Sequence, residues 1–339
     1  MALLVAADIG GTKSDLAIID LSQQPGVDMM RHKRYRNSDF LNFETILTDF
    51  LSNSPVPEYG CLGVAAVIRD DTAKLTNLDW SLDQKILQEQ FGLKKVWLIN
   101  DLTAVCASLP LLREDELFTI QTGQPANHGI RAVIAPGTGL GEGFLLNRET
   151  CLFPQGSEGG HCDFAPLNKE QEKLLSFIQQ KYRPVSYELL CSGLGIPHIF
   201  DYFSTTDIPR DAKQFTLITA ATDKTPFIVE GAHAKTACPL CAKTLSVFLE
   251  ILGSEAGNLA LKTYCVDGLF IGGGILPRLV EHVSFAPFLA NFHQKEKMTK
   301  LMESIPVHII MKHDAALLGS AHYGHHLYQS YKSPAGETS

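Results

Sequence analysis

The sequence has no hydrophobic run long enough to cross a membrane. A transmembrane helix needs roughly 18 to 20 consecutive apolar residues, and no stretch of this 339-residue chain approaches that length. The N-terminal apolar run, residues 1–7, reaches an acid at Asp8 and has no basic flank, unlike a signal peptide. These two absences predict a cytoplasmic protein with no membrane partner.

The chain also lacks a basic excess and a disulfide pattern. It has 29 Lys and Arg against 37 Asp and Glu, a formal net charge of -8, so we expect no nucleic-acid partner. Eight cysteines in a chain of this length indicate reduced, mostly buried thiols. Cys238 and Cys241 have a zinc-like spacing, but no second pair accompanies them, so we expect no zinc.

The familiar nucleotide-binding loops are missing, because no glycine cluster has the spacing of a Walker loop or of a Rossmann fingerprint. Glycine turns between strands are present instead. The first is Asp8-Ile9-Gly10-Gly11-Thr12-Lys13, between the apolar runs 3–7 and 16–19. Glycines permit positive φ and close approach of N–H groups to an anion, Thr12 adds a hydroxyl, and Asp8 can hold a metal-bound water. A Gly-Gly pair is also an ordinary hairpin turn.

Two further glycine turns follow apolar runs. Gly137-Thr138-Gly139 lies between the runs 131–135 and 144–146, and repeats the theme of the first turn. Two such units predict two similar halves, each presenting a backbone nest to one phosphate chain in the cleft between them. Gly272-Gly273-Gly274 follows the strand expected over 266–271 and would let a flat ring lie against the backbone.

Asn100 and Asp101 form a polar pair between the apolar run 96–99 and a helix-like stretch. Open α/β sheets bind ligands at the carboxyl ends of their strands, which makes Asp101 the first candidate for a catalytic group. The alternative is that Asp101 only caps the next helix, because Asp is a favoured N-cap residue.

The rest of the chain supplies one polar loop and a series of regular elements. The glycine-rich stretch 154–164 carries Glu158 and His161, which can hydrogen-bond neutral hydroxyls. Asn77 has the character of a turn residue. Hydrophobic periodicity and end signals predict the other elements. These are strands over 29–35, 61–67 and 305–311, and helices over 41–51, 81–90 (with a Ser81–Gln84 capping box), 169–182, 236–263 and from 313 onward.

Five segments together resemble the bacterial glucokinase family, within the actin, Hsp70 and hexokinase superfold. They occur in the family's order over nearly the whole chain, which makes the resemblance specific. The segments are Asp8-Ile9-Gly10-Gly11-Thr12, Leu98-Ile99-Asn100-Asp101-Leu102-Thr103-Ala104-Val105, Gly137-Thr138-Gly139-Leu140-Gly141, Glu158-Gly159-Gly160-His161-Cys162-Asp163-Phe164-Ala165-Pro166, and Ile271-Gly272-Gly273-Gly274-Ile275-Leu276-Pro277-Arg278.

The resemblance implies a glucokinase of glycolysis, which transfers the γ-phosphoryl group of MgATP to the 6-hydroxyl of glucose. It implies Asp101 as the catalytic base and Asp8 as the Mg²⁺ residue, acting through water. The implied substrate-binding residues are Asn77, Asn100, Asp101, Gly139, Glu158, His161 and Glu188. The implied nucleotide-binding residues are Asp8, Gly10, Gly11, Thr12, Lys13, Gly137 and Thr138 at the phosphates, and Gly272, Gly273 and Gly274 near the adenosine.

The implied fold is a two-domain actin-like, ribonuclease H-like α/β fold with a cleft. We expect a small domain over 1–110 plus 314–330, a large domain over 111–313, a disordered tail over 331–339, and a homodimer. Lys13 departs from the family, which usually has Asn there, and is typical of the related repressor, open-reading-frame and kinase family. The alternatives are a kinase for another hexose or acetamido sugar, ADP or polyphosphate as donor, and an actin- or Hsp70-like ATPase that binds protein.

Overall fold

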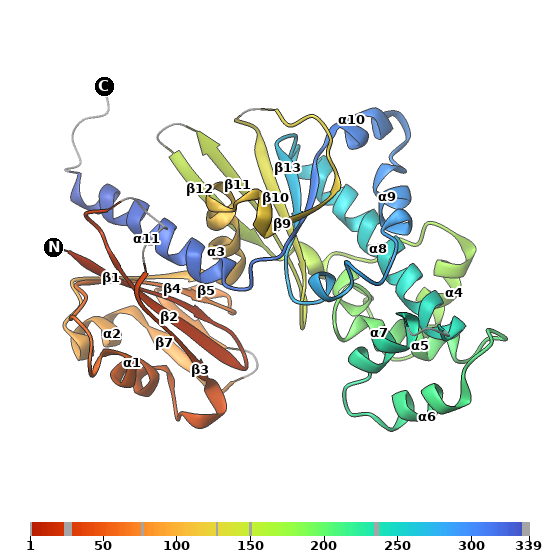
Figure 1. Ribbon diagram of the computed structural model, residues 1–339, viewed down its shortest axis with the longest axis horizontal. Coiled ribbons are helices and arrows are strands. Elements are labelled where there is room, and N and C mark those ends of the chain that lie inside the picture. Colours follow the sequence, from red (N-terminus) through yellow and green to blue (C-terminus); the bar gives the residue numbers. More distant parts are fainter. Residues whose placement is uncertain are drawn as a thin grey trace. The chain divides into compact units, whose positions relative to one another are not determined.

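The computed structural model describes residues 2–23, 29–75, 78–126, 128–148, 151–233 and 237–333 (Figure 1). They form two compact units. Unit 1 comprises 1–116, 143–156 and 312–339, and unit 2 comprises 117–142 and 157–311. In the ranges just given, none of the helices is long and apolar enough to span a bilayer. The predicted α/β class is confirmed, with mixed sheets.

Unit 1 is built on a five-stranded sheet with the order β3-β2-β1-β4-β8. Strand β1 pairs antiparallel with β2 and parallel with β4, which in turn pairs parallel with β8. A small sheet, β5-β6-β7, accompanies it. The strands are β1 Leu3–Ile9, β2 Lys13–Asp20, β3 Met29–Arg36, β4 Tyr59–Val64, β5 Ile68–Arg69, β6 Thr72–Lys74, β7 Ser81–Asp83 and β8 Lys95–Asn100.

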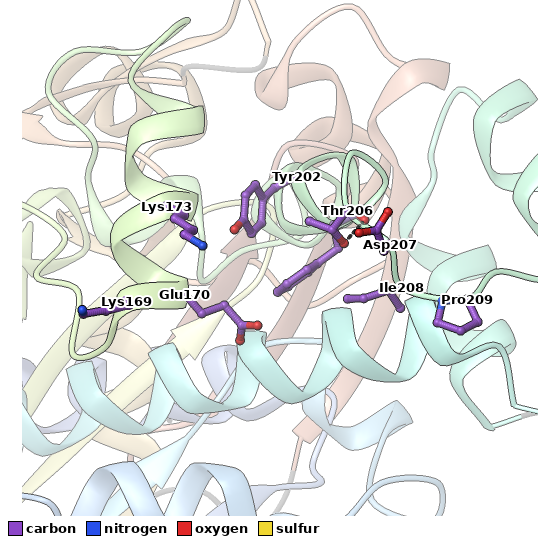
Figure 2. A pocket seen from close by; sticks show the side chains of 9 residues that line it. Lys169, Glu170, Lys173, Tyr202, Thr206, Asp207, Ile208 and Pro209 are labelled. Atoms are coloured by element: carbon purple, nitrogen blue, oxygen red, sulfur yellow. Dashed lines mark hydrogen bonds between the residues drawn. The ribbon is translucent and has the colours of Figure 1, made fainter.

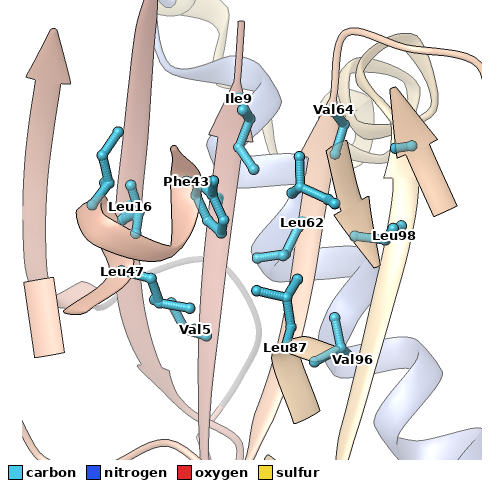
Figure 3. Packing of buried hydrophobic residues seen from close by; sticks show 14 of the residues in the cluster. Val5, Ile9, Leu16, Phe43, Leu47, Leu62, Val64, Leu87, Val96 and Leu98 are labelled. Carbon is cyan, nitrogen blue, oxygen red and sulfur yellow. The ribbon is translucent and has the colours of Figure 1, made fainter. Parts of the chain in front are cut away.

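Both faces of the five-stranded sheet are covered at its centre, which explains why β1 and β4 are nearly continuous apolar runs, whereas the edge strand β3 is mostly polar. Val5 and Ile9 of β1 face a core completed by α1 (Phe43–Leu51) and α2 (Gln84–Phe91), as Figure 3 shows. Leu4 of the same strand faces the opposite core, with α3 (Asp101–Ser108) and α11 (Ala315–Lys332). Burying each large apolar side chain contributes about 1.5 to 3 kcal/mol, so the two cores fix β1 and the turn that follows it.

Helix α3, which begins at Asp101, is held by a close contact with α11. A Cβ at Gly319 of α11 would overlap the carbonyl oxygen of Ala104 in α3, so only glycine allows this approach. Gly63 of β4 is similarly crowded, because a Cβ there would be 2.7 Å from Oγ of Ser320. The C-terminal helix thereby positions α3 against the sheet.

Unit 2 contains strands of a six-stranded sheet with the order β12-β11-β10-β13-β14-β9. Strands β10, β13 and β14 are parallel, and β9 is antiparallel to β14. Helix α8 is buried along most of its length and packs against β10, α5, α7 and α9. The strands of this sheet are β9 Leu117–Gln121, β10 Ile130–Pro136, β11 Leu140–Arg148, β12 Cys151–Ser157, β13 Gly268–Ile271 and β14 Val307–Ile310, of which most of β11 and of β12 group with unit 1. The helices of unit 2 are α4 Lys169–Ile178, α5 Gly195–Phe203, α6 Ala212–Ala220, α7 Thr225–His233, α8 Pro239–Thr263, α9 Ala286–His293 and α10 Thr299–Ser304.

Several predicted details differ from the structure. Helix α2 is capped by Asp83, whose side chain accepts from two backbone N–H groups, whereas Ser81 lies in β7; the predicted Ser81–Gln84 capping box was wrong. Residues 151–157, predicted in part as a loop, form β12 because they pair with β11. Helix α11 runs to Lys332, past the expected start of the tail at 331. Residues 143–156 group with unit 1, although the sequence placed them in the larger domain.

Candidate active site

The side chain of Asn100, at the end of β8, is the N-cap of α3. Its Oδ1 accepts from the backbone N of Leu102 at 2.9 Å, and its Nδ2 donates to the carbonyl of Ala66 at 3.3 Å. Asp101 is the first residue of the helix, and its Oδ1 lies 2.9 Å from the same N of Leu102. Asp101 therefore follows the strand end as the sequence predicted, and Asn100, the N-cap residue, shares with it the hydrogen bond from the N–H of Leu102.

Strand β12, from a distant part of the chain, contacts the start of α3. The N–H of Gly156 in β12 donates to Oγ1 of Thr103 at 3.0 Å. A Cβ at Gly156 would be 2.6 Å from Oδ1 of Asn100, so the strand approaches the cap closely only because this residue is glycine. Sequence reasoning missed both Thr103 and Gly156, because their partnership joins segments far apart in the chain.

Asp8 lies in β1 and pairs with Asp15 of β2 in the sheet register. Burial, followed by the negative charges of Asp101 and Asp15, raises the pKa of Asp8 to about 7; Lys13 and Arg34 oppose this. Asp15 has its own cation, since Nε of Arg34 lies 2.8 Å from its Oδ1. The negative charge of ionised Asp8 is thus only partly offset by nearby cations, and a bound metal ion could offset the rest.

Buried Asn37 holds the first glycine turn in place. Its Nδ2 donates to the carbonyl of Gly10 at 2.8 Å, and its backbone N donates to the carbonyl of Thr12 at 3.0 Å. Neither Gly10 nor Gly11 adopts the positive φ that the sequence analysis invoked. The N–H of Gly10 is also used inside the turn, donating to the carbonyl of Lys13 at 3.0 Å.

The remaining turn residues, Gly11, Thr12 and Lys13, lie at least partly open to solvent. They are the part of the first turn that can reach a ligand, and Asn37 is the residue that sequence reasoning missed here.

The second glycine turn, between β10 and β11, is tied to Glu188. The N–H of Leu140 donates to Oε2 of Glu188 at 3.0 Å, and a Cβ at Gly139 would overlap the same carboxylate. The N–H of Gly137 donates to the carbonyl of Gly139 at 2.8 Å and is therefore used within the turn. Thr138, at the tip of this turn, is exposed.

Glu158, His161 and Glu188 converge in unit 2. His161 ends the short helical turn Gly159–His161, which follows Glu158, and Glu188 lies in a second turn, Tyr187–Leu189. Nε2 of His161 is 3.8 Å from Oε2 of Glu158, and its Nδ1 is 3.9 Å from Oε1 of Glu188. Glu158 and His161 are mostly exposed, so the three side chains present several acceptors and one imidazole to a polar ligand.

The third glycine turn lies beside the second. The N–H of Gly272 donates to the carbonyl of Ile134 at 2.9 Å, next to the end of β10. Gly273 has a φ of 78°, and a Cβ there would overlap the carbonyl of Pro136. Gly274 has nothing within 4 Å of a Cβ position, so its surface is open.

Two more residues bear on the site, one that was not predicted and one that was. Gly193, which was not predicted, joins the second turn by donating its N–H to the carbonyl of Gly137 at 2.8 Å. Asn77, predicted as a sugar-binding residue, lies outside the described residues.

A separate cavity of about 450 Å³ lies beside α4 and the C-terminal end of α5 (Figure 2). Its lining includes Lys173, Glu170 and Tyr202, which the figure labels, and none of the residues predicted for the site. The cavity is therefore not part of the candidate active site.

The fold, the strand-turn-strand units and the polar set define the class of protein as an α/β sugar kinase. The structure matches that of a glucokinase from an Antarctic psychrotroph with a TM-score of 0.81 and 30% identity, covering 96% of this chain and 99% of that chain. It shares its fold with a ROK family glucokinase from Streptomyces griseus in complex with glucose and AMPPNP, at a TM-score of 0.60, 17% identity and coverage of 94% and 98%.

Sequence similarity identifies the family within this class. The family model described as Glucokinase matches residues 5–327. The glucokinase of Nostoc punctiforme is 37% identical over 337 residues, which cover 95% of this chain and 98% of the relative. The chain belongs to the glucokinase family, the ATP-dependent kinases that phosphorylate glucose, and the family predicted from the five segments is confirmed.

Proposed function

We propose that this protein transfers the γ-phosphoryl group of MgATP to the 6-hydroxyl of glucose. The observation that carries the proposal is the position of Asp101, a carboxylate at the head of α3 whose capping function Asn100 supplies. Phosphoryl transfer needs positioning and charge neutralisation more than covalent chemistry. Asp101 orients the sugar hydroxyl and accepts its proton late in the transfer.

The proposed glucose-binding set consists of side chains that can hydrogen-bond sugar hydroxyls. The convergence of Glu158, His161 and Glu188 within unit 2 supports this assignment, since a sugar offers several adjacent hydroxyls that need acceptors and donors. Asn100 and Asp101 belong to the set by family resemblance, and Gly139 leaves room beside Glu188. Asn77 completes it by family resemblance.

The glycine turns are the proposed nucleotide site. The N–H groups of Gly10 and Gly137 hold their own turns, so we assign phosphate contacts to the rest of each turn, including Gly11, Thr12, Lys13 and Thr138. Gly272, Gly273 and Gly274 form the surface for the adenosine.

Asp8 fits a role in holding Mg²⁺ through water, because the negative charges of Asp101 and Asp15 near its partly buried carboxylate favour a neighbouring positive charge. When bound, Mg²⁺ would neutralise phosphate charge.

The remaining assignments concern the protein's surroundings. A net charge of -8 supports small-molecule substrates rather than nucleic acid as ligands. The seven described cysteines are free thiols, which supports a reducing compartment such as the cytoplasm. Family resemblance alone supports a homodimer.

A coupled assay that crosses sugars with phosphoryl donors tests this function. We expect glucose with MgATP to give the highest kcat/KM. A site that hydrogen-bonds each hydroxyl can lower kcat/KM for an analogue by a factor of about 10⁴, because buried polar groups lose their partners. A kcat/KM for N-acetylmannosamine comparable to that for glucose would contradict the proposed acceptor, and comparable rates with ADP or polyphosphate would contradict the proposed donor.

A further inference from the structure

Two glutamates lie buried beneath the sugar-contacting residues of unit 2. Glu142, in β11, is 2% exposed, and Glu255, in α8, is 0% exposed. The Oε1 atom of each has no hydrogen bond within the described ranges of the chain. Buried charges are costly unless they are paired and hydrogen-bonded, so two adjacent carboxylates are a poor choice for stability alone.

The two side chains are close enough to interact directly. Burial, followed by the negative charge of Glu255, raises the pKa of Glu142 to about 8, and Lys262 opposes this. Nζ of Lys262 lies 3.6 Å from Oε1 of Glu255. One proton held between the carboxylates would halve their charge and give their oxygens a hydrogen bond.

Other titratable groups surround the pair. The charge of Glu255, after burial, helps to raise the pKa of Tyr187 to about 12, and both glutamates contribute to the raised pKa of Cys191. Lys295 faces Glu255 from the segment after α9, and burial lowers the pKa of this lysine. Cys191 and Tyr187 thus remain neutral at pH 7, which leaves Lys262 and Lys295 as the nearby cations.

The pair is in direct contact with the turn that carries Glu158 and His161. A Cβ at Gly159 would overlap Oε2 of Glu142, so the turn rests directly on this carboxylate. Oγ of Ser157 donates to the carbonyl of Glu142 at 3.4 Å and accepts from the N–H of Gly159 at 3.2 Å. A displacement of Glu142 would therefore move this turn.

The pair is also linked to the turn that carries Glu188. Nδ2 of Asn258 donates to Oε2 of Glu255 at 2.8 Å and lies 3.3 Å from Oη of Tyr187, the residue before Glu188. Nζ of Lys295 fixes Asn258 by donating to its Oδ1 at 2.6 Å. Both sugar-contacting turns are thus supported by the same two carboxylates.

We infer that Glu142 and Glu255 act as a proton-sharing positioning pair, which holds the turns of Glu158, His161 and Glu188 in their glucose-binding arrangement. The inference rests on the proposed roles of those three residues. When the shared proton is lost, two adjacent buried charges repel each other, and the side chain under Gly159 has to move. Glucose affinity should then fall in alkaline solution.

Calorimetric titration of the full-length protein with glucose, from pH 6.5 to 9.5, tests the inference without requiring catalysis. If only the protonated pair binds glucose, Kd should be flat near pH 7 and rise about tenfold per pH unit above about pH 8, following the one-proton relation. In Glu142→Gln and Glu255→Gln an amide replaces the shared proton, because it keeps the size of the side chain and donates a hydrogen bond. Both variants should lose the alkaline rise.

Glu250→Gln, in the same helix α8 and outside the pair, is the matched control and should keep the rise. A Kd that stays flat to pH 9.5 in the unaltered protein, or a rise retained in both Gln variants, would overturn the inference. Failure of the unaltered protein to bind glucose even at pH 7 would overturn the proposed function, and with it this inference, which is a different result.

Discussion

Asn100 and Asp101, at the start of α3, are assigned different roles, one structural and one catalytic. The amide of Asn100 accepts the hydrogen bond that starts the helix and is anchored to the carbonyl of Ala66. Asp101 comes one residue later, where a negative charge also suits the positive end of the helix dipole. Because Asn100 also accepts from the N–H of Leu102, the start of α3 does not depend on the Asp101 carboxylate alone.

Asp101→Asn should therefore remove activity without unfolding the protein. The change keeps the size of the side chain and removes the base, and general-base contributions are typically about 10² to 10⁴ in rate. We expect kcat to fall by that factor while Tm stays near that of the unaltered protein. Steady-state kinetics and thermal melting check this, with Asn100→Ala as the control that should lower Tm through loss of the cap. A folded Asp101→Asn enzyme with more than about a tenth of the original kcat would remove Asp101 from the mechanism.

At the scale of elements, the sequence predicted those strands whose apolar pattern is sufficient to identify them. The apolar runs before each glycine turn became β1, β10 and β13, since a strand buried on both faces needs such a run. Elements that depend on distant partners were harder. Residues 151–157 look like a loop because of their proline and glycine, yet they pair with β11. Sequence spacing alone could not show that a cross-chain partner would override local propensity.

The contact between α11 and α3 is a similar long-range feature, and it is testable. In Gly319→Ala the new methyl group would overlap the carbonyl of Ala104, a backbone atom that cannot rotate away. We expect α3 to shift, with a loss of about 1 to 3 kcal/mol in stability from overpacking and a fall in kcat because Asp101 moves with the helix.

Chemical denaturation and kinetics measure these two effects. The matched control is Gly60→Ala in β4, where a Cβ would meet only ordinary contacts of 3.5 Å or more. Equal stability and equal kcat for the two variants would show that the close approach of α11 does not position α3.

For the whole molecule, the sequence allowed predictions about individual residues of the candidate site but not about their arrangement. The five family segments follow one another in chain order, and residue types such as the glycines of the turns indicate their chemistry directly. The convergence of His161 with Glu188, and the burial of Glu142 against Glu255, arise only when segments distant in the chain pack together. Buried acids of this kind carry no local signal that distinguishes them from surface acids.

The pH dependence of the protein's stability should reflect the proposed metal-binding role of Asp8. The pKa of Asp8 is raised from 3.8 to about 7 in the folded protein, so between those values the folded chain binds more protons than the unfolded chain. Stability without a metal ion should therefore fall as pH rises from about 4 through 7, because the carboxylate of Asp8 ionises more readily in the unfolded chain than in the folded one. A cation beside Asp8 would offset this loss.

Asp8→Asn should accordingly have a higher Tm than the unaltered protein at pH 8 without metal, and the difference should shrink as pH falls and disappear below the unfolded-state pKa of 3.8, where Asp8 is protonated in both the folded and the unfolded chain. Mg²⁺ should raise Tm at pH 8 only in the unaltered protein, because ligands that bind the folded state stabilise it. Zinc should remain below stoichiometric level in both proteins, because Cys238 and Cys241 have no second pair of ligands in the sequence. Thermal melts across pH with EDTA or Mg²⁺, alongside kcat, make the comparison.

Asp15→Asn is the control and should lower Tm, because it breaks the pair with Arg34. If Asp8→Asn were less stable at pH 8 yet fully active, Asp8 would be a structural carboxylate and the magnesium assignment would fail.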